Sequence, residues 1–250
     1  MTLWDDYFAR YQGLPTWSTE VDDVYDDDQR TALEERLAAD FSVHYPPSSQ
    51  EDVAWFVGAL DDEQRKYFVA FVLQQPRKVP EVLYEPMMRA AIREPDPSRD
   101  RVFVEPCMET FGLRRVNGTL LAWFDTLSDR EKAGAVQAMY HAGLISIKYS
   151  DRSRPDAELV FGRLGDLWMR QRCLLLQEFV KNSSVAVRQR IIPHLDLKDA
   201  ASYPEELRSF VPQAIQIAEN HPDAYIRHRL EIQLGSSEIQ LFSPLPPMPE

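Results

Sequence analysis

The chain has 250 residues and a mass of 29.0 kDa, enough to bury a hydrophobic core without disulfides or a structural metal. It is 44% hydrophobic and 27% charged, with a mean hydropathy of −0.40, and it contains no run of about 20 apolar residues. We therefore expect a soluble globular protein. The first residues lack a signal-peptide pattern and the only cysteines are Cys107 and Cys173, so we expect a cytoplasmic protein without a disulfide framework.

Negative charge is concentrated at the start of the chain. The whole chain has a net charge of −12, and residues 1–64 hold sixteen Asp or Glu against three Lys or Arg. The remaining residues are therefore close to neutral. A negative field of this kind attracts cationic surfaces and repels nucleic acid. We expect a protein partner with a basic surface, and neither nucleic acid nor a membrane as a partner.

The first part of the chain has apolar residues at helical spacing. Asp28 is expected to cap one helix and Ser49 a second, which ends near residue 60. A third helix is expected from Asp61 until Pro76 stops it. Residues 79–113 contain five prolines, and Pro80, Pro86 and Pro106 among them predict short, broken helices. The pattern Glu-Pro-Xaa-Met occurs twice in this range, twenty residues apart.

The second part of the chain predicts longer helices joined by short turns. One helix is expected up to Leu127, and Ser128 with Glu131 forms a capping-box pattern for the next helix, which Gly143 is expected to end. The longest helix is expected over residues 156–182, followed by two helical hairpins. No segment shows the alternation of a half-buried strand, so the fold class is predicted to be all-α.

Two segments near the end of the chain can be aligned on one another. Val187-Arg188 corresponds to Ile226-Arg227 at an offset of 39 residues, each pair following a polar turn. This pattern resembles the signature of HEAT repeats, most clearly over residues 113–235. The resemblance implies a right-handed stack of antiparallel helix pairs, a HEAT-like superhelix whose second helices line a concave surface that grips another macromolecule.

The resemblance and the charge pattern together predict the organisation of the chain. Residues 1–64 are expected to form an irregular acidic cap, continuous with a helical-repeat region over residues 65–235. Residues 236–250 are rich in proline and are expected to form an extended tail.

Catalytic and metal-binding patterns find little support in the sequence. Neither cysteine lies in a reactive motif, the five histidines are scattered, and no phosphate-binding glycine loop is present. We therefore expect a non-enzymatic protein without a cofactor or a bound metal.

The candidate binding residues combine aromatic rings with carboxylates, a combination that suits a cationic surface. Trp4, Phe8 and Tyr11 share one helix face and are expected to be core. The residues expected to bind the partner are Tyr7, Trp17, Asp22, Asp23, Tyr25, Asp26, Asp27 and Asp28, together with Arg190 and Arg229. Arg188 and Arg227 are expected to be structural, and Arg190 and Arg229 to be exposed, because two residues correspond to about 200° around a helix.

Three functions remain open from the sequence. The first is a protein-binding helical scaffold for a cationic partner. The second is an immunity or inhibitor protein that neutralises a basic toxin enzyme. The third, resembling helical-repeat DNA glycosylases, is a nucleic-acid-binding enzyme, and it rests on the arginines around positions 170–172, 188–190 and 227–229.

Overall fold

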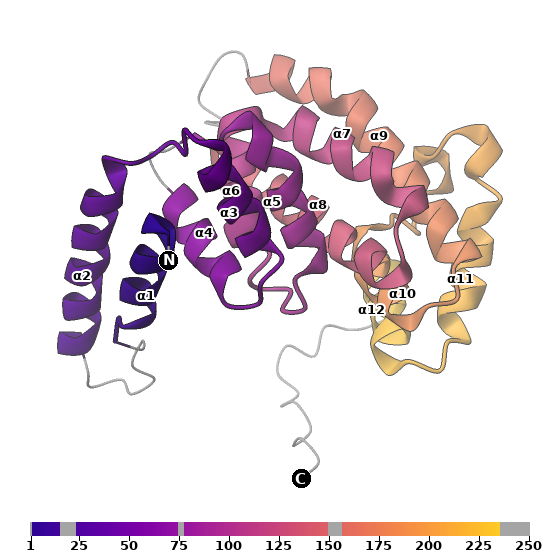
Figure 1. Ribbon diagram of the computed structural model, residues 1–250. Helices are drawn as coiled ribbons and strands as arrows, with labels where there is room; N and C mark the ends of the chain where they lie inside the picture. Colours follow the sequence, from indigo (N-terminus) through magenta and orange to yellow (C-terminus); the bar gives the residue numbers. More distant parts are fainter. Residues whose placement is uncertain (1, 16–23, 75–77, 150–156, 236–250) are drawn as a thin grey trace, which may run out of the picture. The chain divides into compact units, whose positions relative to one another are not determined.

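A computed structural model describes residues 2–15, 24–74, 78–149 and 157–235 (Figure 1). The side chains of residues 24–28, 145–149 and 157–163 are not described. All regular structure in the described ranges is helical, which confirms the predicted all-α class. No described helix is long and apolar enough to cross a membrane. The predicted tail, residues 236–250, lies outside the described residues.

The chain forms two compact units. Unit 1 comprises residues 1–116 and 137–150, and unit 2 comprises residues 117–136 and 151–250. The boundary passes through two helices, α7 (Leu113–Trp123) and α8 (Asp129–Tyr149), which give residues to both units. The expected boundary after residue 64 lies inside unit 1, so the acidic segment belongs to a larger unit.

Unit 1 begins with four helices, namely α1 (Leu3–Gln12), α2 (Val24–Ser42), α3 (Gln50–Leu60) and α4 (Arg65–Leu73). Ser49 caps α3 as predicted, because its Oγ accepts a hydrogen bond from the Asp52 backbone at 3.0 Å. The expected cap at Asp28 is wrong, since α2 already begins at Val24.

Residues 79–113 are more regular than expected. They form α5 (Glu81–Arg93) and α6 (Arg101–Phe111), each with a proline inside the helix, Pro86 and Pro106. Each proline is the sixth residue of its helix, so the repeated Glu-Pro-Xaa-Met pattern occupies the same place in both. Proline removes one intrahelical hydrogen bond. Buried side chains around both prolines, including Leu83, Met87, Met88, Phe103 and Cys107, hold these helices together.

Helices α3, α4, α5 and α6 of unit 1 pack as two stacked hairpins. The first hairpin is α3 with α4 and the second is α5 with α6. The first helices of the two hairpins, α3 and α5, pack on one another, and so do the second helices, α4 and α6. The result is two layers of helices, and α1 adds to the second layer by packing on both α2 and α4.

Unit 2 repeats this arrangement with α9 (Ala157–Lys181), α10 (Val185–Ile191), α11 (Phe210–Glu219) and α12 (Ala224–Leu234). Helix α9 packs on α10 and α11, while α12 packs on α11 and α10. These are the two hairpins that the 39-residue offset predicts, and the aligned Val187 and Ile226 are both fully buried. Short 3-10 helices occur at 124–126, 192–194, 200–202 and 205–207.

Helix α8 departs from its predicted end. Ser128 and Glu131 form the capping box as predicted, with 2.8 Å between Ser128 Oγ and Glu131 Oε2. The helix then runs through Gly143 to Tyr149, so the expected stop at Gly143 is wrong. A helical glycine costs only about 1 kcal/mol relative to alanine, which the burial of Ala142 and Met139 beside it offsets.

The aligned arginines share a structural role. Arg188 Nε donates to the Phe179 carbonyl at 3.1 Å, near the end of α9. Arg227 Nη1 donates to the Pro222 carbonyl at 2.8 Å and to the His221 carbonyl, both in the turn before α12. Each arginine therefore satisfies carbonyl groups of its own hairpin, whereas we expected carbonyl or carboxylate groups of the adjoining repeat.

Arg190 and Arg229 are half-buried, so their expected exposure is wrong. Both lie on second helices, and α10 packs on α9 as well as on α12. When a helix has neighbours on two sides, those neighbours also cover part of the face opposite its most buried residues. Arg190 and Arg229 lie on such a face.

Replacing Arg188 with Ala is expected to lower the free energy of unfolding by about 1–3 kcal/mol, because the Phe179 carbonyl loses its donor where α9 has no further turn to supply one. Chemical denaturation measures the change. The matched control is Arg170→Ala at an exposed position of α9, expected within about 0.5 kcal/mol of the native chain. Equal losses at the two positions would show that the carbonyl contact is unimportant.

Candidate functional site

The aromatic residues of α1 are core residues. Trp4 and Phe8 are buried as predicted, and the ring of Tyr11 packs against Phe68 and Phe71 of α4, with ring centroids 5.4 and 5.2 Å away. Tyr7 is also buried, and its hydroxyl donates to the Asp40 carbonyl at 3.2 Å. The assignment of Tyr7 to partner binding is therefore wrong, because only 5% of the residue is exposed.

Helices α1 and α3 are joined by two reciprocal hydrogen bonds. The Trp4 indole donates to Asp52 Oδ1 at 2.8 Å, and the Trp55 indole donates to Asp5 Oδ1 at 2.9 Å. Each acceptor is also the third residue of its helix and closes a capping box there. The hydrogen bond from Trp55 is the main reason that the pKa of Asp5 is lowered to about 2.

The remaining acidic and aromatic candidates lie where side chains are not described. Trp17, Asp22 and Asp23 are outside the described residues. Tyr25, Asp26, Asp27 and Asp28 belong to the first turns of α2, but their side chains are not described. Their part in binding a cationic partner stays a prediction.

The arginines of unit 2 are largely engaged within the unit. Besides Arg188 and Arg227, Arg172 donates to Ser202 Oγ at 2.7 Å, lies 3.3 Å from Asp196 and covers the ring of Tyr203. A phosphate-binding groove needs guanidinium groups that face solvent. These contacts count against the nucleic-acid alternative.

The candidate reactive residues are packed. Cys107 is fully buried, and burial raises the pKa of its thiol to about 12, so it is not a nucleophile at neutral pH. His141 Nδ1 lies 2.7 Å from Asp100 Oδ1, and this contact joins α8 to the residue before α6. Within the described residues, no group of three or more His, Cys, Asp or Glu side chains could hold a metal ion.

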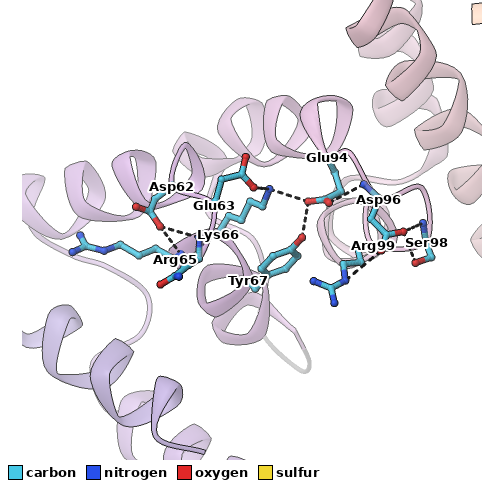
Figure 2. Close-up of polar contacts among 10 residues, drawn as sticks. Asp62, Glu63, Arg65, Lys66, Tyr67, Glu94, Asp96, Ser98 and Arg99 are labelled. Atoms are coloured by element: carbon cyan, nitrogen blue, oxygen red, sulfur yellow. Dashed lines mark hydrogen bonds and ion pairs between the residues drawn. The ribbon is translucent and has the colours of Figure 1, made fainter. Parts of the chain in front are cut away.

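An ionic cluster lies between α4 and the end of α5 (Figure 2). Lys66 Nζ lies 3.0 Å from Glu94 Oε2 and 2.7 Å from Glu63 Oε2, and the side chains of Lys66 and Glu94 are 6% and 1% exposed. The Tyr67 hydroxyl donates to Glu94 Oε2 at 2.9 Å, and the Asp96 backbone donates to Glu94 Oε1 at 3.1 Å. The buried carboxylate therefore has a charged partner and two further donors.

The outer edge of the cluster is formed by Arg99. Its guanidinium group lies over the Tyr67 ring, 5.2 Å from the centroid. Its Nε is 3.5 Å from Asp96 Oδ2, and 59% of the side chain remains exposed. Arg99 is thus held in place by one ring and one carboxylate while still facing solvent.

A depression of about 650 Å³ opens beside this cluster, and it is the candidate functional site. Its volume is in the range of small-ligand sites. Side chains from α1, α2, α4 and α6 and from the turns before α4 and α6 converge on it. Its apolar wall is Phe8, Tyr11, Tyr67 and Val102, and its polar rim is Gln12, Arg30, Glu63, Gln64 and Arg99.

Sequence reasoning missed this site for a physical reason. Lys66 and Glu94 are 28 residues apart on different hairpins, and only the stacking of α4 and α6, which sets α5 beside them, brings the pair together. The single available signal was a lysine inside the apolar face of residues 66–72, because such a residue needs a buried counter-charge.

Comparison of the chain with protein-family models, with curated proteins and with solved structures gave no match. The site is therefore interpreted from its own geometry.

Replacing Trp55 with Phe is expected to raise the pKa of Asp5 from about 2 toward 3.8, because the ring is kept but the indole donor is lost. Because the pKa of Asp5 is lower in the folded chain than in the unfolded chain, the ionised carboxylate stabilises the fold above pH 3.8, and this stabilisation is lost as the pH falls to about 2. In the variant, the free energy of unfolding should therefore fall less steeply between pH 3.8 and 2. Carboxyl NMR titration measures the pKa. Trp168→Phe in unit 2 is the control and should leave Asp5 unchanged.

Replacing Lys66 with Ala is expected to cost about 3–5 kcal/mol of unfolding free energy, because Glu94 is left buried without its counter-charge. The control is Glu63→Gln, which removes the other, 79% exposed partner of Lys66 and is expected to cost about 0–1 kcal/mol. Urea denaturation compares them. A larger loss for Glu63→Gln would mean that the exposed pair, and not the buried one, stabilises this cluster.

Proposed function

We propose that this chain is a non-enzymatic protein-binding scaffold built from stacked helical hairpins, and that unit 1 binds a cationic protein partner. The support is that, in the described part of the first 64 residues, aromatic side chains are buried while carboxylates are exposed. The described aromatic rings of α1 are packed inward, whereas Asp6, Glu35, Asp40, Glu51, Asp61, Asp62 and Glu63 are all exposed. This part of unit 1 therefore presents carboxylates to a partner.

The HEAT-like superhelix belongs to the same proposal. Both units stack hairpins with first helices on first helices and second helices on second helices, as in helical-repeat proteins that grip a partner along one layer. In unit 1 the second layer also carries the depression. Binding along this layer would place a partner beside the exposed carboxylates of the turn between α3 and α4.

The partner is to be identified first. The tagged chain is used to capture proteins from its native host, and captured proteins are identified by mass spectrometry. The proposal expects a protein with a basic surface whose capture weakens as salt is added, because screening shortens the Debye length from about 10 Å at 0.1 M to about 3 Å at 1 M.

Changing Asp22, Asp23, Asp26, Asp27 and Asp28 to Asn is then expected to slow association with that partner more than it speeds dissociation, because these charges act on the approaching partner from a distance. Stopped-flow or surface-based kinetics at two salt concentrations measure both rates. The control neutralises five exposed carboxylates of unit 2, Asp199, Glu205, Glu206, Glu219 and Glu231. An association rate that ignores both the N-terminal changes and salt would count against the proposal.

A further inference from the structure

The depression in unit 1 carries cationic side chains on its rim. Unit 1 carries most of the negative charge of the chain, yet two of the three charged side chains on the rim of the depression are arginines, Arg30 and Arg99. The third, Glu63, is paired with Lys66 at 2.7 Å. Arg30 is itself paired with Glu34 at 2.9 Å, whereas Arg99 lies 3.5 Å from Asp96, so Arg99 is the less tightly paired cation of the rim.

Hydrogen-bond donors converge on this space from different elements. Tyr11 lines the depression together with Arg30 and Arg99. Burial raises the pKa of Tyr11, and Arg30, Glu34 and Arg99 are close enough to act on it. The Tyr11 hydroxyl forms no hydrogen bond with any described residue. Gln64 accepts from Gln12 Nε2 at 3.0 Å through Oε1, and its own side-chain amide N–H groups form no hydrogen bond with a described residue.

Arg99 is prepared to bind an anion. Its contact with the Tyr67 ring restricts the position of the guanidinium group. The competing carboxylate of Asp96 lies 3.5 Å from Nε and is itself held by the Ser98 backbone and hydroxyl, at 2.9 and 2.7 Å. A guanidinium group has five N–H donors and binds carboxylates and phosphates in a bidentate manner.

We infer that the depression binds an oxyanion carried on a flat apolar body. The oxyanion is received by Arg99, the Tyr11 hydroxyl and the Gln64 amide, and the apolar body lies against Phe8, Tyr67 and Val102. The oxyanion is a carboxylate or a phosphate monoester, which share this chemistry. The inference is independent of the proposed function, because its ligand is a small anion and not a cationic protein.

Three small probes test the chemistry on the full chain. They are N-acetylphenylalanine, its uncharged amide and phenyl phosphate, titrated while NMR follows the side-chain amides of Gln12 and Gln64 and the Arg99 Nε. N-acetylphenylalanine is expected to bind with a dissociation constant of about 1 mM or lower, and the amide about tenfold more weakly. Tighter binding of phenyl phosphate would assign the natural oxyanion as a phosphate, and tighter binding of N-acetylphenylalanine as a carboxylate.

Variants locate the site. Arg99→Gln and Tyr11→Phe are each expected to weaken binding of the preferred probe by about tenfold, the effect of losing one hydrogen bond to a charged group. Tyr11→Phe keeps the ring contacts with Phe68 and Phe71, so it tests the site even where Arg99→Gln perturbs the fold.

The matched control is Arg101→Gln, which removes an exposed arginine two residues from Arg99 that is paired with Glu105 at 3.1 Å outside the depression. Its affinity should equal that of the native chain. Three results would overturn the inference: no binding of either anion at 10 mM, equal affinity for the amide, or an Arg101→Gln loss as large as that of Arg99→Gln.

Discussion

The burial of the aromatic face of α1 is the interaction on which unit 1 depends. Trp4 packs edge-on against Phe56 of α3, with centroids 4.6 Å apart, while Phe8 and Tyr11 pack on Phe68 of α4. Aromatic side chains bury large areas, and their contacts favour tilted and edge-on geometries. The two indole–carboxylate bonds add direction to this packing, because each indole N–H must reach one particular carboxylate. The first helix is thereby fixed to the first hairpin, and the depression acquires one wall.

The same interaction explains which parts of the site could be predicted. Helical spacing placed Trp4, Phe8 and Tyr11 in the core, as the structure confirms. Tyr7 was wrongly predicted to lie outside this face. It is three positions from Trp4 and Phe8 is four, and both spacings place a residue on the same helix face as Trp4. Local signals such as the Ser49 and Ser128 caps were also predictable, since their hydrogen bonds join residues three apart. The structural role of Arg188 and Arg227 was predictable because both follow a similar polar turn, and backbone carbonyl groups in or just before each turn need a donor.

Other features depend on distance in the sequence and could not be predicted. Proline in the middle of α5 and α6 suggested broken helices, yet both helices are continuous. The burial of Met87 and Cys107 stabilises them, and this burial is a property of the stacked hairpins. In the same way, the half-burial of Arg190 and Arg229 follows from α10 and α12 each having neighbours on two sides. A helical period reports which face of one helix is apolar, but not how many neighbours cover it.

The ionic cluster of Lys66 and Glu94 positions side chains of the site, although burying the two charges costs free energy. Desolvation offsets much of the attraction between buried charges such as Lys66 and Glu94, and apolar pairs of similar volume often stabilise a fold as well as a buried ion pair does. An apolar pair, however, would give Tyr67 no acceptor for its hydroxyl and would leave the Asp96 backbone without Glu94. Tyr67 and the turn that carries Asp96 are the two groups that hold Arg99. Glu94 therefore positions both groups that contact the exposed Arg99, through its hydrogen bonds with Tyr67 and the Asp96 backbone, and Lys66 supplies the counter-charge that Glu94 needs.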